Sequence, residues 1–403
     1  MAAYLLDWLG LLLRWLHMIA GIAWIGASFY FVWLDNHLQP PDDAARSDAG
    51  VAGELWAVHG GGFYRAQKYR VAPALLPPTL HWFYWEAYTT WLSGFLLLCL
   101  LYFWRAQAYL IDPAVAALSR PTAIGIALAF LLLSWLIYDG LCRSALARHA
   151  GALAAVLGVL LASEAWGLCQ LFSGRGAFIV FGSAVGTIMV ANVLFVIIPG
   201  QRELVYAKQQ GRDPDPAPGM RGKQRSVHNT YFTLPVLFVM ISNHYAMTYG
   251  ARYNWLVLIA ISAAGACIRA WFVSRHGADA RGGHVPALPA VLAAVLLVAV
   301  IVALAPAHSR GGAAAPAPGG ETARVQAIVQ MRCVPCHAAE PTLAGFSAAP
   351  NGIILQTLDQ LRSHLPEVQQ QLSARTMPLG NLTAMTEDER TAMLTWIGHG
   401  ARP

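Results

Sequence analysis

Two cysteines and a histidine near the C-terminal end, Cys333, Cys336 and His337, form the pattern Cys-x-x-Cys-His. This pattern is the attachment signature of a c-type haem: the two thiols add to the haem vinyl groups, and the adjacent histidine is placed to ligate the iron. A zinc site would need a second Cys/His pair at similar spacing, but no cysteine follows Cys336. A redox pair of cysteines needs no histidine directly after it. The motif therefore predicts one covalently bound haem c with His337 on its iron.

A second axial ligand is expected some tens of residues downstream, on a flexible strap. Met377, which precedes Pro378, fits this position. A thioether ligand raises the potential of haem iron, which suits an electron acceptor. The rival ligands are Met385, Met393, His364 and His399. Met393 falls at helical spacing with Trp396 and Ile397, so we expect it in a core. We predict Met377 as the ligand.

The residues that follow the strap predict one more helix. Thr386 and Glu389 stand three residues apart, as in a capping box that opens a helix. Residues 321–403 therefore resemble a small class I cytochrome c, with a helix, the haem motif, a strap, a methionine and a final helix. In bacteria such haems are attached outside the cytoplasmic membrane, so the preceding chain must deliver the C-terminus there.

The composition excludes a fully soluble protein. Of the 403 residues 57% are hydrophobic and only 12% are charged, about half the charged fraction of soluble domains. The net charge of +6 is modest, and the basic residues lie between apolar runs, which argues against nucleic acid as a partner. Cys99, Cys142, Cys169 and Cys267 are scattered through apolar segments, and we interpret them as small hydrophobic residues. The first apolar run is too long for a cleavable signal peptide, so it is predicted to be a retained span.

Apolar runs of about twenty residues, the length that crosses a bilayer, recur along the chain. The expected spans are 9–34, 79–104, 121–140, 150–172, 177–199, 228–249, 253–274 and 286–305. We therefore predict an all-α protein: a polytopic membrane helix bundle of about eight spans over residues 1–308, a flexible Ala/Pro/Gly linker over 309–320, and a C-terminal class I cytochrome c domain over 321–403.

The loop charges predict the orientation of this bundle. Eight spans put both termini on one side, which the haem motif places outside. The loops expected inside carry, among others, Arg65, Lys68, Arg70, Arg143, Arg202, Lys208, Arg221 and Arg225, whereas the outer loops carry Arg105, Arg120, Arg175 and Arg252. This asymmetry follows the positive-inside rule. The expected location is the bacterial cytoplasmic (inner) membrane, in contact with lipid, with the N-terminus and the cytochrome domain periplasmic.

Polar residues within spans are costly and mark candidate functional sites. The inner layer holds Asp35, His81, Glu86, Asp139, Arg269, His228 and Asn229, with His59 in the adjoining loop; the outer layer holds Arg14, His17, Glu164, Asn243 and His244. His17 lies roughly 12 Å and His244 roughly 8 Å from the outer ends of their spans. The two histidines are candidate ligands of a haem b within the membrane. The alternative is that each only hydrogen-bonds to a neighbouring helix.

The first inner loop contains a histidine followed by three glycines, His59 to Gly62. Glycines allow the backbone to approach a ligand closely. A tight turn is the simpler explanation of the same run.

The chain also contains several longer motifs, at residues 15–30, 53–64, 172–175, 226–229 and 242–245. With the Cys-x-x-Cys-His motif they make the chain resemble, over nearly its whole length, the membrane-bound, cytochrome-c-linked urate oxidases (urate hydroxylases) of bacterial purine catabolism. The resemblance implies oxidation of urate to 5-hydroxyisourate, with electrons passing to the fused haem and then to a downstream cytochrome or terminal oxidase of the respiratory chain.

Urate is a flat anion at neutral pH, so its site needs aromatic stacking, cationic or N–H donors and a base. The candidate substrate-binding residues are Arg225, Asn229, Trp56, Phe63 and Glu54, and the candidate catalytic residues are His228, His59, His81 and Glu86. We favour His228 as the base because Arg225 and Asn229 adjoin it at the mouth of one helix.

Two other functions suit the same polar layers. The protein could oxidise membrane quinol, or another donor, and reduce the cytochrome without purine chemistry, or it could be a transporter with an appended cytochrome. No Rossmann-type glycine fingerprint is present in the sequence, which argues against a flavin or nicotinamide cofactor. The sequence leaves open the membrane cofactor, the oligomeric state and whether peroxide forms.

Overall fold

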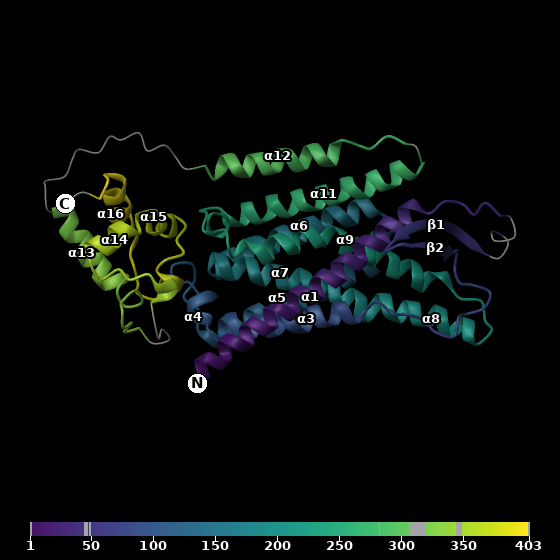
Figure 1. Ribbon diagram of the computed structural model, residues 1–403, viewed down its shortest axis with the longest axis horizontal. Helices are drawn as coiled ribbons and strands as arrows, with labels where there is room; N and C mark the ends of the chain where they lie inside the picture. The colour runs from purple at the N-terminus through teal and green to yellow at the C-terminus, as the bar shows by residue number, and fades with distance from the viewer. Residues whose placement is uncertain are drawn as a thin grey trace.

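The computed structural model describes residues 2–43, 47, 50–281, 283–305, 320–343 and 349–401. The molecule is elongated: a bundle of long helices forms its middle, a β-hairpin extends from one end, and a small helical unit lies at the other (Figure 1). Both chain termini lie at the end that carries the small unit. Residues 309–319 of the expected linker are outside the described residues.

The bundle is built from long helices joined by short ones. In chain order the elements are α1 (Ala2–His37), β1 (Val51–His59), β2 (Gly62–Tyr69), α3 (Trp85–Leu97), η1 (Leu98–Phe103), α4 (Ala106–Tyr109), α5 (Arg120–Arg143), η2 (Ala145–Arg148), α6 (Ala150–Leu171), α7 (Gly174–Asn192), η3 (Val193–Ile197), α8 (Ile198–Gln209), α9 (Pro216–Ser242), α10 (Ala246–Tyr249), α11 (Asn254–Arg281) and α12 (Leu288–Ala303). The expectation of a mostly helical protein is confirmed, with the hairpin as the exception.

Six stretches of helix are long and apolar enough to cross a membrane, counted over the described residues: Tyr4–His37, Trp85–Phe103, Arg120–Arg143, Ala150–Leu171, Gly174–Gln209 and Asn254–Ala278. The last expected span is the shorter apolar helix α12, of 16 residues. The expected span 228–249 differs most, because α9 starts earlier, at Pro216, and stops at Ser242. Asp215 caps this helix by accepting a hydrogen bond from the Ala217 N–H at 2.9 Å, and proline suits its first position.

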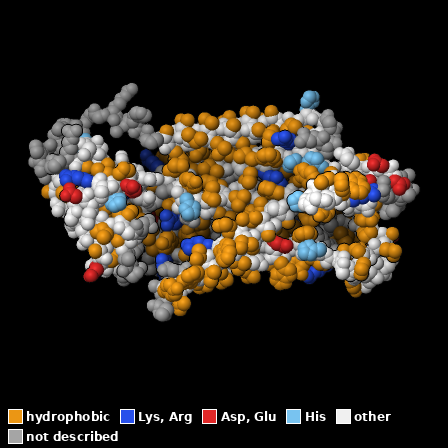
Figure 2. Space-filling model, in the orientation of Figure 1, with side chains coloured by type: hydrophobic (Ala, Val, Ile, Leu, Met, Phe, Trp, Pro, Cys, Tyr) orange, Lys and Arg blue, Asp and Glu red, His pale blue; other side chains and the backbone are white. Residues whose placement is uncertain are grey.

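Helix α7 lies at the centre of the bundle and packs against α5, α6 and α9. Its glycines allow this close packing: a Cβ on Gly182 would lie 2.5 Å from Val239 Cγ1 of α9. By contrast, large apolar side chains of α1 and α12, such as Trp15, Ile22 and Ile301, are exposed. Hydrophobic side chains cover most of the visible face of the bundle (Figure 2). An exposed apolar surface of this extent suits a helix bundle surrounded by lipid.

The β-hairpin explains the glycine run after His59. Strands β1 and β2 pair antiparallel, and His59 pairs with Gly62. Gly60 and Gly61 therefore form a two-residue turn, with φ of +57° and +81°. Positive φ at both central residues is the requirement of the type I′ hairpin turn, which glycine satisfies without strain. The tight-turn explanation of this run is thus the one that the backbone supports.

The C-terminal unit packs around its own core. Its elements are α13 (Gly320–Arg332), η4 (Pro350–Gly352), α14 (Leu358–Ser363), α15 (Leu365–Ser373), η5 (Leu379–Asn381) and α16 (Glu387–Gly398). The predicted capping box of Thr386 and Glu389 opens α16 as expected. Met393 is fully buried in the core with Trp396, which confirms its predicted place.

Candidate functional site

A cluster of buried polar side chains connects α5, α7 and α9. Asn192 of α7 donates through Nδ2 to Tyr138 Oη at 3.0 Å and to Asn229 Oδ1 at 2.9 Å. Asn229 in turn donates to the backbone carbonyl of Met189 at 2.9 Å. Tyr138 Oη lies 2.8 Å from His228 Nδ1. The cluster therefore links Tyr138 of α5, Asn192 of α7 and two residues of α9, and Asn229 uses both ends of its amide within the protein.

Arg225 joins this cluster through Asp139. Arg225 Nη2 donates to Asp139 Oδ1 at 2.7 Å, while Arg143 Nε donates to Oδ2 of the same carboxylate at 2.6 Å. The Arg225 guanidinium also lies over the Tyr138 ring, 5.0 Å from its centroid. Arg225 is only 3% exposed, and its Nη1 has no hydrogen-bond partner among the described residues. Two arginines thus share one carboxylate, and one buried donor of Arg225 is left unused.

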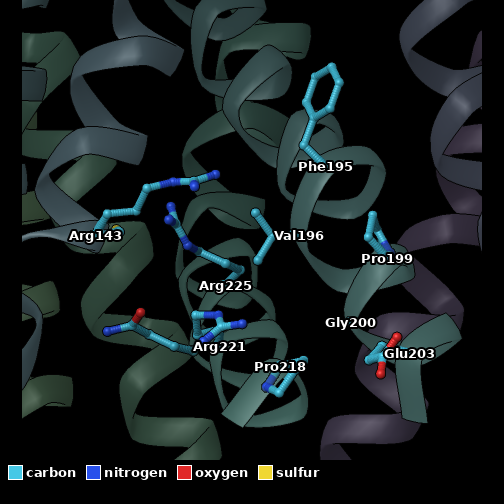
Figure 3. Close-up of a pocket in the computed structure, with 11 residues that line it drawn as sticks. Arg143, Phe195, Val196, Pro199, Gly200, Glu203, Pro218, Arg221 and Arg225 are labelled. Atoms are coloured by element: carbon cyan, nitrogen blue, oxygen red, sulfur yellow. The ribbon is translucent and has the colours of Figure 1, made fainter. Parts of the chain in front are cut away.

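Arg225, the residue that carries this donor, is among those that line a cavity of about 350 Å³. The cavity is lined by Cys142, Arg143, Phe195, Val196, Pro199, Gly200, Glu203, Pro218, Arg221, Gln224 and Arg225. Figure 3 shows Arg143 and Arg225 on one side of the cavity, with Phe195 and Pro199 on the other. Three arginines outnumber the one carboxylate of the lining, Glu203, and with the apolar, partly aromatic wall they suit a small, flat anion.

A larger cavity, of about 960 Å³, lies on the other side of the cluster, where Asn229 is part of its wall. Helices α1, α8, α9 and α11 and the segment after β2 contribute to it, with aromatic residues Trp24, Phe31, Trp82 and Phe83. His81 also lines it, with its ring 4.5 Å from that of Phe83. The candidate substrate residues Arg225 and Asn229 therefore face two different cavities.

His228 lies behind the wall of the smaller cavity. Its Nδ1 is 3.8 Å from Cys142 Sγ, and Cys142 lines the cavity. Because Tyr138 Oη already accepts from Asn192, its own hydroxyl hydrogen is available to His228 Nδ1. This arrangement makes Tyr138 and Cys142 the groups between His228 and the cavity.

The candidates on the hairpin lie apart from both cavities. Glu54 is buried and pairs with Arg65 at 2.6 Å, and the same arginine lies 5.2 Å from the Trp56 ring centroid. Trp56 and Phe63 are 62% and 80% exposed, and His59 is exposed beside the turn. None of these four is part of either cavity wall.

Glu86 occupies a different place, on α3. Its Oε2 is buried and has no hydrogen-bond partner among the described residues. It lines neither cavity.

His17 packs against α3 in a defined tautomer. Its Nδ1 lies 2.9 Å from the Thr90 carbonyl oxygen, which only accepts, so Nδ1 carries the hydrogen and Nε2 keeps a free lone pair. A Cβ on Gly94 would lie 2.8 Å from His17 Cε1, so the glycine makes room for the ring. Iron-ligating histidines usually donate their second nitrogen to a carbonyl in this way. His244 is exposed in the turn after α9, and no contact between it and His17 is present in the described part of the chain.

In the C-terminal unit, His337 has the same arrangement as His17. Its Nδ1 lies 2.9 Å from the Ile353 carbonyl oxygen, which leaves Nε2 free. Cys333 and Cys336 are free thiols, and burial raises the pKa of Cys333 to about 12. Met377 is half-buried, and Arg390 Nη1 fixes its backbone by donating to the Met377 carbonyl at 2.8 Å.

The rival ligands of Met377 have other partners. Met385 and Met393 are in the core, and His399 lies 3.5 Å from Glu321. His364 is half-buried at the start of α15. The free Nε2 of His337 and the adjacent thiols of Cys333 and Cys336 suit a c-type haem, with Met377 as the expected second ligand. Within the described residues, no group of three His, Cys, Asp or Glu side chains forms a metal site.

Some members of the cluster were not predicted from the sequence. Asn192 was detectable as a strongly polar residue inside an apolar span, and Tyr138 only as a neighbour of Asp139. Arg143 and Arg221 were interpreted simply as loop charges. Their convergence depends on how α5 and α9 pack, which no local pattern reveals.

The fold and the site define a mostly helical protein with helices of membrane-spanning length and a buried polar cluster between two cavities. A family model described as "Urate oxidase N-terminal" matches residues 3–305, the whole bundle. Because the match covers more than half of the chain, the protein belongs to this family, which associates it with urate and with oxidoreductase chemistry. The comparisons with curated proteins and with solved structures gave no match.

Proposed function

We propose that the protein is a membrane-bound enzyme that oxidises urate to 5-hydroxyisourate and passes the electrons singly to a haem c in its C-terminal unit. In this reaction one urate and one water give one 5-hydroxyisourate, two electrons and two protons. Family membership supports the substrate and the oxidoreductase class. The motif Cys333 to His337 supports the electron acceptor.

The observation that carries the proposal is Arg225, a buried arginine that lines the smaller cavity and has one donor without a partner among the described residues. A buried donor without an acceptor costs about 1–3 kcal/mol, and an anion in the cavity would remove this cost. Arg225 offers a planar fork that matches the carbonyl–nitrogen edge of a purine anion. Arg143 and Arg221 add positive charge, and Phe195 and Pro199 cover the opposite side. A volume of about 350 Å³ is in the usual range for small-molecule sites.

In this proposal, the hydrogen-bonded pair of Tyr138 and His228 takes up the proton released during oxidation. Tyr138 lies under the Arg225 guanidinium and beside His228 Nδ1. When the Tyr138 hydroxyl receives a proton, it can therefore pass its own proton to His228 Nδ1. We assign His228 the role of proton acceptor and Tyr138 that of relay. His81, in the larger cavity, is the alternative base.

The C-terminal residues hold the haem, which supplies a one-electron acceptor. Cys333 and Cys336 form the covalent links, and His337 and Met377 are the iron ligands in this proposal. The Ile353 carbonyl fixes the ring of His337, and Arg390 fixes the strap at Met377. These contacts fix the ring of His337 and the backbone of Met377.

The proposed location is the bacterial cytoplasmic (inner) membrane, with the N-terminus and the C-terminal unit periplasmic. The residues of the smaller cavity come from the end of α5, from α8 and from the start of α9. Helix α8 lies at the end of the bundle opposite the C-terminal unit (Figure 1). The substrate would thus enter from the cytoplasm, and a periplasmic cytochrome or a terminal oxidase would take the electrons.

The test is an anaerobic optical spectrum of the purified protein in detergent, with urate or quinol as reductant. We expect urate, and not quinol, to reduce the haem. Arg225→Gln should weaken urate binding about 10- to 100-fold, the effect of losing a hydrogen bond to a charged group. Arg225→Lys keeps the ion pair with Asp139 and controls for folding. Arg70→Gln, at an exposed position that lines neither cavity, is the neutral control.

Two outcomes would contradict the proposal. Reduction by quinol alone would identify a quinol-oxidising electron-transfer protein. Normal urate oxidation by both Arg225 variants would remove urate from the smaller cavity, and His81→Ala would then test the larger one.

A further inference from the structure

The short helix α4 is fixed at the end of the bundle nearest the C-terminal unit (Figure 1). Ser173, which caps α7, donates through Oγ to the Tyr109 carbonyl at 2.8 Å and through its N–H to the Leu110 carbonyl at 2.9 Å. A Cβ on Gly176 would lie 3.0 Å from the Leu110 backbone. The start of α7 therefore sits directly against α4, and the motif 172–175 has a role as the junction between them.

Next to this junction, tyrosines gather around Arg175. Arg175 Nη2 donates to Tyr249 Oη at 2.9 Å, and its guanidinium lies 5.5 Å and 5.6 Å from the ring centroids of Tyr249 and Tyr109. The rings of Tyr109 and Tyr102 are 6.0 Å apart in an edge arrangement. Tyr102 Oη donates to Asn243 Oδ1 at 3.1 Å. This aromatic cluster reaches from α4 into the bundle.

A Cβ on Gly174 would lie 2.0 Å from the Tyr249 carbonyl oxygen. Only glycine fits here, so Tyr249 is held against the start of α7. The aromatic cluster is therefore built on backbone packing and does not depend on flexible side chains alone.

On its other side, α4 contacts η5 of the C-terminal unit. Helix η5 begins at Leu379, directly after Met377 and Pro378. Arg390, which holds the Met377 carbonyl, is also near enough to Asp112 for an attractive charge interaction. The strap that carries the proposed iron ligand is thus the part of the unit that rests on α4.

We propose that α4 is the docking surface for the Met377 strap, and that the cluster of Tyr102, Tyr109, Tyr249 and Arg175 is the exit through which electrons leave the bundle. This inference rests on the proposed function, because it concerns the same electrons. Electron tunnelling is faster through packed and hydrogen-bonded atoms than through gaps. Because α4 is fixed, the strap stays packed against α4, and α4 stays packed against the tyrosine rings.

The experiment combines variants of Asp112 and Tyr109, with controls, and two measurements. Asp112→Arg opposes Arg390 with a like charge, whereas Asp112→Asn keeps the oxygen that accepts from the Ala114 N–H. Asp213→Arg, exposed between α8 and α9, controls for the added charge. The first measurement is hydrogen exchange of peptides that cover residues 106–112 and 377–381. The second is stopped-flow reduction of the haem by urate, with reduction by ascorbate as the direct control.

For Asp112→Arg we expect faster exchange in both peptides and urate-driven reduction slowed at least about tenfold, because like charges oppose each other at the contact. Ascorbate should still reduce its haem at the normal rate. Tyr109→Leu should slow urate-driven reduction without faster exchange at the strap, and Tyr109→Phe should restore it.

Unchanged exchange in Asp112→Arg would overturn the docking surface, and a normal rate in Tyr109→Leu would overturn the exit. If urate reduces no haem in the unaltered protein, the proposed function fails. The exchange measurement still decides the docking in that case.

Discussion

At the scale of single residues, some buried charged groups of the bundle lack a full set of hydrogen-bond partners among the described residues. Asp139 serves two arginines, and Arg225 keeps an unused donor. Burying a charged group is costly unless it is paired and hydrogen-bonded. A residue of this kind inside a helix bundle is therefore better explained by a ligand than by stability. The neighbouring Tyr138 and Asn192 are fully buried and bonded to each other, and Asn192 Oδ1 also lacks a partner among the described residues.

The relay role of Tyr138 gives a prediction at this scale. Tyr138→Phe removes the hydroxyl between Asn192 and His228 but keeps the ring under the Arg225 guanidinium. We expect urate to bind with nearly unchanged affinity, and its oxidation to slow about 100-fold, the lower limit for loss of a proton-transfer group. Titration with urate and single-turnover haem reduction measure the two quantities separately.

Tyr206→Phe is the matched control, because Tyr206 is an exposed tyrosine of α8. A Tyr138→Phe protein that oxidises urate at the normal rate would exclude the relay. Weaker binding at an unchanged rate would instead assign Tyr138 to positioning Arg225.

At the scale of elements, the sequence predicted the features that depend on residues close together in the chain. The capping box of Thr386 and Glu389 was readable because its hydrogen bonds span only three residues. In the same pair, burial opposes ionisation, but hydrogen bonds from Arg332 and the Thr386 backbone outweigh it and lower the pKa of Glu389. The start of α9 was missed because hydropathy marks where lipid begins, whereas the helix begins at its cap, Asp215.

The site was predicted less well than the helices. Arg225, Asn229 and His228 were chosen because they adjoin in sequence, and the structure places them in one cluster. The same reasoning could not show that Arg225 and Asn229 face opposite cavities. The pairing of Arg225 with Asp139 joins residues 86 positions apart, which only helix packing can bring together.

The contact between α1 and α3 gives a prediction at the element scale. We propose a second redox centre in the bundle, a haem b with His17 as one ligand, because two electrons must leave urate singly. Gly94→Ala adds a Cβ that would lie only 2.8 Å from the present position of His17 Cε1. The ring must then move away from the Thr90 carbonyl, and the b-type spectrum of the purified protein should be lost or shifted.

Gly26→Ala on α1 is the control, because nothing lies within 4 Å of its added Cβ. The haem c spectrum should persist in both variants. A Gly94→Ala spectrum identical to that of the unaltered protein would remove His17 as a ligand, and a bundle without any b-type spectrum would remove the centre itself.

At the scale of the whole molecule, hydropathy predicted the long helices because lipid acts on whole helices. Most of the apolar runs of about twenty residues became helices long enough to cross a membrane, and the orientation from the loop charges stays a prediction. The hairpin was not predicted, because only the first part of β1 is buried and most other side chains of the pair are exposed, which leaves no clear alternation.

The orientation of this architecture gives the last prediction. The hairpin and α8 lie at one end of the bundle and the C-terminal unit at the other. Basic loops remain in the cytoplasm, so alkaline phosphatase fused after residue 310 should be active in cells, and inactive when inserted beside Lys208, between α8 and α9. Green fluorescent protein at the same two positions should give the opposite pattern, because it matures only inside. If phosphatase were active beside Lys208 and inactive after residue 310, the cavity of Arg225 would open outside. Cytoplasmic urate would then need a carrier before it could reach the site.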